Sequence, residues 1–240
     1  MKSIKSRFSR ILLKLSGESL ASKKNNENIN SITLDYIVQE VSSVTKLGIE
    51  LGIVIGGGNI WRGGRQKKIS RITADYMGML ATQINSLALH DTLIHAGIPV
   101  VIESALEMPK IAEFYKSTKT IEYLKKKNIV IFSCGTGNPY FTTDTAAALR
   151  AVEIDADVFL KATQVDGVFS SDPVKNKSAV KYKSLTFGKA IEKQLAIMDM
   201  TSFTLCMENK LPVIVFNFYK PGNLLKIITG EKIGTEITNG

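Results

Sequence analysis

Short apolar runs alternate with longer stretches of helical spacing along almost all of the 240 residues. The runs are Arg10–Leu15, Ile49–Ile55, Ile98–Ile102, Ile129–Phe132, Ala156–Thr163, Val213–Asn217 and Ile233–Ile237. Strands that alternate with helices pair in parallel, and the helices cover both faces of the sheet. We therefore predict an α/β fold with three layers, α/β/α, around one mostly parallel sheet.

The stretches between these runs carry apolar residues at helical intervals. Helices are expected from Ser31 or Thr33 to Lys46, Ile69 to Ala96, within Glu103–Lys127, Ala146 to Ile154, Ser184 to about Leu195, Thr201 to Asn209 and Pro221 to Thr229. The longest stretch has an apolar stripe of Ile72, Tyr76, Met79, Leu80, Ile84, Leu87 and Leu93. We expect its methionines to lie in the core, because a flexible thioether side chain fills irregular gaps there.

No linker or change of composition divides the chain, so residues 10–240 are predicted to form a single domain after a basic extension at residues 1–9. The basic start is followed by no apolar signal core, and the apolar runs are too short to span a membrane. Two cysteines make neither a disulfide framework nor a zinc spacing. A cytoplasmic location is expected, without a membrane partner.

The formal net charge is +9. The lysines are scattered, and the one dense run, Lys125–Lys127, lies at a predicted helix end, where cations are favoured. No RNA-binding signature with interleaved aromatic residues is present. We interpret the charge mainly as a solvated surface, so nucleic acid is not the expected partner, although a nucleic-acid-binding regulator is an alternative.

The loops that follow the predicted strands have the composition of anion sites. Lys14 interrupts a buried strand just before Ser16 and Gly17, and a buried ammonium group needs anionic partners. An edge strand that faces water is the alternative for this lysine. Three glycines, Gly56–Gly58, follow the next strand and allow backbone amides to approach a ligand, with Arg62 four residues further on.

Two further loops lie at the same predicted edge of the sheet. The stretch from Gly135 to Asp144 is rich in amides and hydroxyls and has a carboxylate where a helix begins. This composition suits phosphate recognition, and equally an ordinary turn with a helix cap. Lys161 near the end of another strand is followed by Asp166 and Asp172.

Together these loops offer lysines, an arginine, free amides and carboxylates at the carboxyl edge of one sheet, where ligands bind in such folds. This is the inventory for phosphoryl transfer, with cations and amides to neutralise oxygens and carboxylates to hold Mg²⁺ or to orient lysines. The Walker signature and the protein-kinase signatures are both absent.

Five motifs resemble those of bacterial uridylate kinases, a branch of the amino-acid kinase fold family. They are Lys14-Leu-Ser-Gly-Glu18, Val54-Ile-Gly-Gly-Gly-Asn-Ile-Trp-Arg62-Gly63, Asp75-Tyr-Met-Gly-Met-Leu-Ala81, Gly135-Thr-Gly-Asn-Pro-Tyr-Phe-Thr-Thr-Asp144 and Leu160-Lys-Ala-Thr-Gln-Val-Asp-Gly-Val-Phe169. The resemblance runs from about Arg10 to Ile237. The fourth block is the one specific to the uridylate branch.

The resemblance implies that ATP donates its γ-phosphoryl group to UMP with Mg²⁺, giving UDP and ADP in pyrimidine nucleotide biosynthesis. It implies that Lys14 and Lys161 stabilise the transferring group. The implied ATP contacts are Lys14, Leu15, Ser16, Gly17, Gly58, Arg62, Thr163, Phe169 and Asp172. The implied UMP contacts are Gly57, Asp75, Thr136, Gly137, Asn138, Pro139, Tyr140, Phe141, Thr142 and Thr143. From the residues alone, we interpret Asp75 as an acidic residue in the first turn of a helix, where it would stabilise the helix dipole.

No metal ligand is assigned, because the nucleotide phosphates would mainly hold Mg²⁺, with Asp144 a candidate contact. Asp144, Asp166 and Asp199 either bind metal or orient lysines and loops. The resemblance also implies a homo-oligomer, a hexamer, and feedback inhibition by UTP. GTP activation is not implied, since Ala21–Asn30 lacks the glycine-rich segment of GTP-responsive members. A relative that phosphorylates a carboxylate or carbamate, and a nucleotide-binding module without turnover, are the alternatives.

Overall fold

The computed structural model describes residues 6–22, 26–62 and 68–240. These residues contain one sheet with the strand order β4-β3-β5-β2-β1-β6-β8-β9-β7. The strands are β1 (Arg10–Leu15), β2 (Glu50–Ile55), β3 (Val100–Ser104), β4 (Glu113–Phe114), β5 (Ile129–Ser133), β6 (Val158–Thr163), β7 (Ser184–Thr186), β8 (Val213–Asn217) and β9 (Thr235–Thr238). Neighbouring strands are parallel except for β8 and β9.

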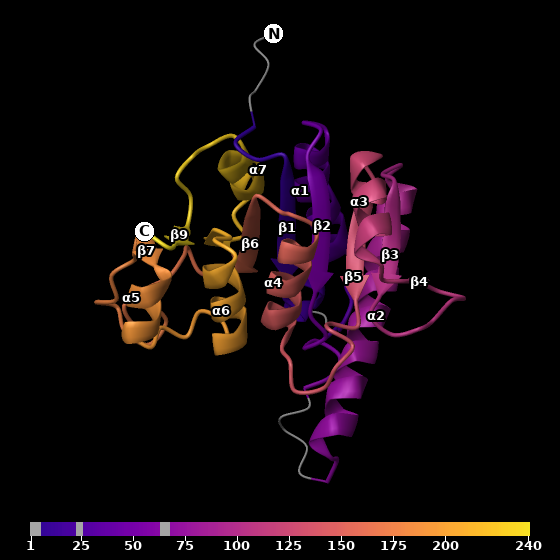
Figure 1. Cartoon of the computed structure of the whole chain (residues 1–240), viewed down its shortest axis with the longest axis horizontal. Coiled ribbons are helices and arrows are strands. Elements are labelled where there is room, and N and C mark those ends of the chain that lie inside the picture. The colour runs from indigo at the N-terminus through magenta and orange to yellow at the C-terminus, as the bar shows by residue number, and fades with distance from the viewer. Residues whose placement is uncertain (1–5, 23–25, 63–67) are drawn as a thin grey trace.

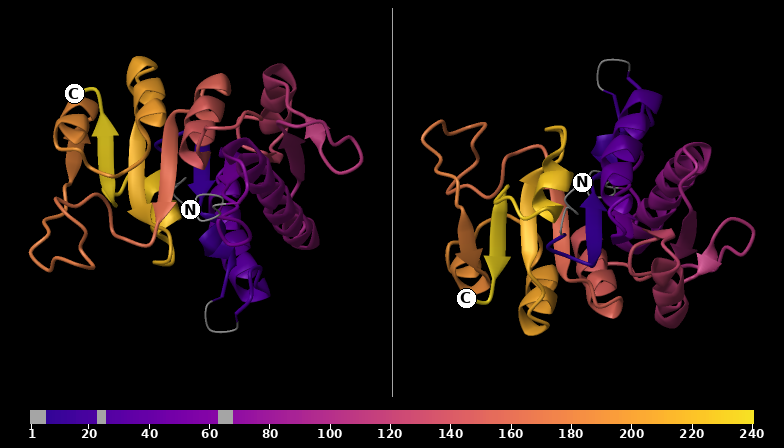
Figure 2. Two further views of the ribbon diagram at one scale, coloured as in Figure 1. Left: turned by 90° about the horizontal axis from the view of Figure 1, so that it is seen from below. Right: turned by 90° about the horizontal axis from the view of Figure 1, so that it is seen from above.

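Helices cover both faces of this sheet. They are a 3₁₀ turn, η1 (Gly17–Leu20), and α1 (Ser31–Thr45), α2 (Arg71–His95), α3 (Ser117–Lys125), α4 (Thr143–Glu153), α5 (Phe187–Glu192), α6 (Met200–Glu208) and α7 (Asn223–Ile228). Figure 2 shows α1, α2 and α7 on one face and α3 to α6 on the other. The predicted three-layer α/β/α fold is therefore confirmed. None of the helices in the described ranges is long and apolar enough to cross a membrane.

The central strands are buried on both faces. In β2, Leu51, Ile53 and Ile55 pack in the core beneath α1 and α2, whereas Val54 packs in the core beneath α4. A strand covered on both faces has a continuous apolar sequence rather than an alternating one. This is why the central strands were predicted from apolar runs, although Lys14 and Lys161 each interrupt one of them.

The predicted helix from Ser184 to about Leu195 is wrong at its start. Ser184–Thr186 form β7, which pairs in parallel with β9 at the edge of the sheet. The helix α5 begins only at Phe187, where the Thr186 hydroxyl accepts the Lys189 N–H. The two-residue strand β4 was also not predicted. Strands this short carry no periodic signal.

Most residues of the apolar stripe predicted on α2 are exposed to solvent. Ile72, Leu80 and Ile84 are each about half exposed (49%, 48% and 49%). The buried face of α2 contains small and polar residues in its middle part, among them Ala81, Thr82, Gln83, Asn85 and Ser86. Further along the helix Leu89 and Leu93, the second a member of the predicted stripe, are fully buried in the core. Met79 is buried as expected, whereas Met77, the other methionine of this helix, is only half-buried.

The carboxyl ends of the central strands face one edge of the molecule, the lower edge in Figure 1. The loops after β1, β2, β5 and β6 gather there. The N-terminal part of α2 extends beyond this edge, beside the loop that leads into α4 (Figure 1). Residues far apart in the sequence thus meet in a single region.

Candidate active site

Two lysines lie side by side at the centre of this edge. Strands β1 and β6 are neighbours, and Lys14 is in register with Lys161. Residues in register on adjacent strands point to the same face of the sheet. The two side chains are only 13% and 11% exposed, so Lys14 is not a water-facing lysine of an edge strand. Strand β6 continues to Thr163, so Lys161 lies before its last residue.

Asp144 bridges the two lysines. Its Oδ2 lies 2.5 Å from Lys161 Nζ and its Oδ1 lies 3.0 Å from Lys14 Nζ. The carboxylate is in the first turn of α4, where the helix dipole favours negative charge. Burial opposes its ionisation, but the two ammonium groups outweigh burial and lower the pKa of Asp144. Burial lowers the pKa of Lys161, which also donates to the Ile197 carbonyl at 2.5 Å.

Asp199 holds the start of α4 from the other side. It caps α6, accepts a hydrogen bond from the Thr142 hydroxyl, and accepts one from the Thr145 hydroxyl at 2.8 Å. Burial opposes its ionisation, whereas these hydroxyl donors lower the pKa of Asp199. Asp199 therefore positions the helix that carries Asp144. Asp166 lies apart from both lysines and pairs with Lys220 and Asn217.

Glycine is required where the first two loops meet. A Cβ on Gly17 would lie 2.4 Å from Asn59 Oδ1 and 2.5 Å from the Gly56 carbonyl. A Cβ on Gly57 would lie 2.8 Å from the Gly78 carbonyl of α2. These two glycines thus allow close packing of backbone. Gly58 has open space on its Cβ side, as a residue that faces a ligand would.

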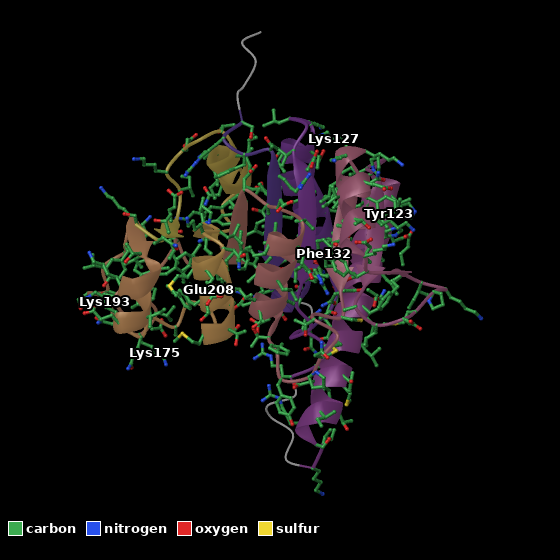
Figure 3. The ribbon with its side chains drawn as sticks, viewed as in Figure 1. Tyr123, Lys127, Phe132, Lys175, Lys193 and Glu208 are labelled. Atoms are coloured by element: carbon green, nitrogen blue, oxygen red, sulfur yellow. The ribbon has the colours of Figure 1, made fainter. Side chains whose placement is uncertain are left out.

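A cavity of about 510 Å³ lies on the β6 side of the lysines. Of the implied ATP residues, Thr163, Phe169 and Asp172 line it, together with Lys161. Its opposite wall is the segment between α5 and α6, with Lys193, Gln194, Leu195, Ala196 and Ile197. In Figure 3 Lys193 lies beside α5. We refer to this space as the donor cavity.

The phosphate end of the implied ATP site is formed by two smaller features. A cavity of about 240 Å³ is lined by Lys14, Ser16, Lys161 and Thr163, so it adjoins the donor cavity. The Leu15 side chain is fully buried in the core and leaves only its backbone near the site. Arg62 forms an ion pair with Glu18 and donates from Nε to the Gly58 carbonyl at 3.0 Å.

A third cavity of about 330 Å³ lies on the other side of Asp144 and contains many of the implied UMP residues. We refer to it as the acceptor cavity. Gly57, Asp75, Thr136, Phe141, Thr142 and Thr143 line it, and so does Gly58, which the resemblance implied as an ATP contact. Gly137, Asn138, Pro139 and Tyr140 are outside this lining; Gly137 packs against Ala105, and Asn138 bonds to Thr136 within the loop.

Several lining residues were not predicted from the sequence. Trp61, Arg71, Gly78, Met79 and Thr82 line the acceptor cavity from α2 and the loop before it. Asp75 was interpreted from the residues alone as a first-turn acid, which is wrong, because α2 begins at Arg71. Asp75 accepts hydrogen bonds from Arg71 Nε at 2.7 Å and from the Tyr140 backbone N–H at 2.8 Å. The Asp-Tyr-Met-Gly-Met motif was the signal for this wall.

The fold and the bridged lysines between two cavities are those of an α/β phosphotransferase. The chain belongs to the amino acid kinase family, which it matches over residues 9–217. It is similar to the crystal structure of UMP kinase from Bacillus anthracis, with a TM-score of 0.94 and 40% identity, covering 97% of this chain and 96% of that one.

Two further solved structures are similar over nearly the same length. The structure of UMP kinase from Ureaplasma parvum has a TM-score of 0.91 and 36% identity, covering 97% of this chain and 99% of that one. That of uridylate kinase from Archaeoglobus fulgidus has a TM-score of 0.70 and 29% identity, covering 95% and 99%. The resemblance carried by the sequence motifs, and with it the expectation of an enzyme, is therefore confirmed.

Proposed function

We propose that this enzyme transfers the γ-phosphoryl group of ATP to UMP and forms UDP and ADP. The observation that carries the proposal is the Lys14–Asp144–Lys161 bridge, placed between a donor and an acceptor cavity. The names of the similar solved structures supply the acceptor. Pyrimidine nucleotide biosynthesis in the cytoplasm is the corresponding role.

The chemistry of UMP fits the groups in this site. A phosphate monoester has a second pKa near 6, so it is largely ionised at neutral pH and needs no general base. One of its oxygens attacks the γ-phosphorus of ATP, the bond to the β-phosphate oxygen breaks, and that oxygen leaves on ADP. The difficulty is to bring two anions together, which requires cations and amides.

Lys14 and Lys161 are the cations proposed for this step. Each ammonium group is held by Asp144, so it needs little reorganisation when phosphate oxygens arrive. Gly17, Gly58 and Arg62 are proposed at the ATP phosphates, with Thr163, Phe169 and Asp172 at the adenosine. Gly57, Asp75 and the loop from Thr136 to Thr143 are proposed to hold UMP.

Mg²⁺ is the proposed cofactor and would neutralise charge on the nucleotide phosphates. Both oxygens of Asp144 are engaged by ammonium groups, and no cluster of three His, Cys, Asp or Glu side chains suited to a metal occurs in the described ranges. This donor set fits an ion that would be held chiefly by phosphate oxygens, with Asp144 as the protein carboxylate that would contact it.

ADP release with a panel of acceptors tests the proposal. We expect turnover with UMP to exceed that with CMP, glutamate or carbamate, and preference for a carboxylate or carbamate would support the alternative family chemistry. Lys161→Ala should lower kcat by orders of magnitude while nucleotide binding largely survives. Lys127→Ala removes the same charge from a side chain that is 55% exposed and pairs with Glu50, which lines neither cavity, and is the matched control. Near-normal kcat in Lys161→Ala would overturn the assigned role.

We also propose a homo-oligomer, a hexamer, with feedback inhibition by UTP. The exposed stripe of α2 (Ile72, Tyr76, Leu80, Ile84, Leu87 and Ile94) supports assembly, because contiguous exposed apolar surface marks protein interfaces. Leu80→Asp should reduce the mass in solution, whereas Val174→Asp, at a residue that is 83% exposed elsewhere, should not. Turnover measured with added UTP and with added GTP tests inhibition and activation. The segment Ala21–Asn30, on which the expectation about GTP depends, includes residues 23–25, which lie outside the described ranges.

A further inference from the structure

Three residues join the start of α2 to the tip of the loop before α4. Arg71 Nε donates to Asp75 Oδ2 at 2.7 Å, and the Tyr140 backbone N–H donates to the same oxygen at 2.8 Å. The Arg71 guanidinium carbon lies 5.5 Å from the centre of the Tyr140 ring, within the range of a cation–π contact. One carboxylate oxygen thus connects two segments about 65 residues apart along the chain.

This cluster lies at the acceptor cavity. Arg71 and Asp75 line the cavity from α2, and the neighbour of Tyr140 in the loop, Phe141, lines it from the other side. The part of α2 that carries Arg71 extends beyond the edge of the sheet (Figure 1), so few core contacts restrain it. The contact to Asp75 therefore restrains the loop at a place where the core does not.

The backbone of Tyr140 needs such a restraint. Its φ is +73°, in the left-handed region that favours glycine. A residue keeps this conformation when surrounding groups fix it, and the N–H donated to Asp75 is such a group. The Tyr140 ring is 63% exposed, so packing in the core does not hold it.

The two oxygens of Asp75 have different surroundings. Oδ2 accepts both hydrogen bonds, whereas no described residue donates to Oδ1. The side chain is 19% exposed and borders the cavity. Arg71 and Tyr140 thus fix the rotamer of Asp75 and leave its second oxygen available to a hydroxyl group in the cavity.

We infer that Arg71 is a positioning residue for the acceptor: it orients Asp75 toward the ribose hydroxyls of a nucleoside monophosphate and holds Tyr140 so that the loop stays closed over the cavity. The inference rests on the proposed function, since it names how the same cavity selects its acceptor. Arg71 acts through Asp75 and Tyr140. Its loss should therefore affect acceptor selection more than the phosphoryl transfer itself.

Steady-state kinetics with UMP and with 2′-deoxy-UMP test this role. For Arg71→Ala we expect KM for UMP to rise about 5- to 20-fold, the range for loss of a partly exposed ion pair and a cation–π contact. We expect kcat and KM for ATP to stay within about two-fold. The preference for UMP over 2′-deoxy-UMP should fall, because a misoriented Asp75 no longer distinguishes the hydroxyl. Arg71→Lys should restore part of it.

Lys119→Ala is the matched control. Lys119 forms an ion pair with Glu113 of β4 and a cation–π contact with Tyr123 of α3, 5.4 Å from its ring centre, so it combines a cation, a carboxylate and a tyrosine as Arg71 does. Figure 3 shows Tyr123 on α3, far from the lower end of α2. This variant should leave KM for UMP and the preference for UMP unchanged.

A double variant separates positioning from a general structural effect. Because Arg71 acts through Asp75, Arg71→Ala combined with Asp75→Asn should lose no more preference for UMP than Asp75→Asn alone. Unchanged discrimination in Arg71→Ala, or fully additive losses in the double variant, would overturn the inference. Absence of UMP-dependent ADP release in the unaltered enzyme would instead refute the proposed function.

Discussion

Replacing Asp144 by asparagine removes the one carboxylate that pairs with both Lys14 and Lys161, at 3.0 and 2.5 Å, and keeps the size of the side chain. All three side chains are 11–16% exposed, so the pairs are mostly desolvated. Removing one partner of a buried pair costs about 3–5 kcal/mol, because the remaining charges stay buried without compensation. Because the three side chains are partly exposed, we expect the free energy of unfolding to fall by the lower value of this range, about 3 kcal/mol.

Urea unfolding followed by circular dichroism measures this loss. With a slope of about 3 kcal/mol per M, the midpoint should fall by about 1 M at equal protein concentration. ATP should narrow the gap between the variant and the unaltered chain, because its phosphates replace the missing anion beside the lysines. Turnover should fall in the same variant, since the lysines lose the group that orients them.

The effect of Asp144→Asn should depend on pH in one direction. The folded pKa of Asp144 is lowered, so the stability it contributes is fully present above its unfolded pKa and is lost as the pH falls through its folded pKa. The two proteins should therefore converge in acid and differ most near neutral pH. A loss of stability that is the same at all pH values, or no loss at pH 7, would refute the reasoning.

Two further predictions concern the interior and the first loop. Glu103 is buried, and burial raises its pKa to about 7, although the Thr120 hydroxyl opposes this. The folded carboxyl stays protonated while the unfolded one ionises, so the free energy of unfolding should fall by up to about 3 kcal/mol as pH rises from about 4.5 to about 7. In urea unfolding, Glu103→Gln should weaken this dependence on pH. The same dependence in Glu103→Gln and in the unaltered chain would contradict the prediction. Gly17→Ala places a Cβ within 2.5 Å of Asn59 and Gly56, so it should destabilise the fold by about 1–3 kcal/mol and raise KM for ATP. An unchanged melting temperature of Gly17→Ala would show that the two loops do not pack this closely.

The sequence predicted the centre of the sheet well because burial on both faces leaves an unmistakable apolar run. Strand β1 has the predicted bounds, Arg10–Leu15, and Lys14, which interrupts it, is mostly buried and pairs with Asp144. The edge strands β4 and β7 were missed, since two or three residues carry no period. Their existence depends on neighbours that are distant in the sequence.

The orientation of α2 shows a different limit. Apolar spacing predicts which residues share a helix face, but it does not state whether that face meets the sheet or the solvent. The middle of the sheet-facing side of α2 is polar because its residues bond to the loops: Asn85 donates to the Gly56 carbonyl, and Thr82 accepts the Cys134 N–H. The wall of the donor cavity from Lys193 to Ile197 was likewise not predicted, because only folding brings this segment opposite β6.

The contacts of Asp199 connect the linings of the two cavities. Asp199 accepts from Thr142, which lines the acceptor cavity, and it follows Ile197, which lines the donor cavity and accepts from Lys161. Asp199 thus connects a residue of one cavity lining to the segment that lines the other. Since coupling between two binding sites is reciprocal, the factor by which a bound donor changes acceptor affinity equals the factor by which a bound acceptor changes donor affinity.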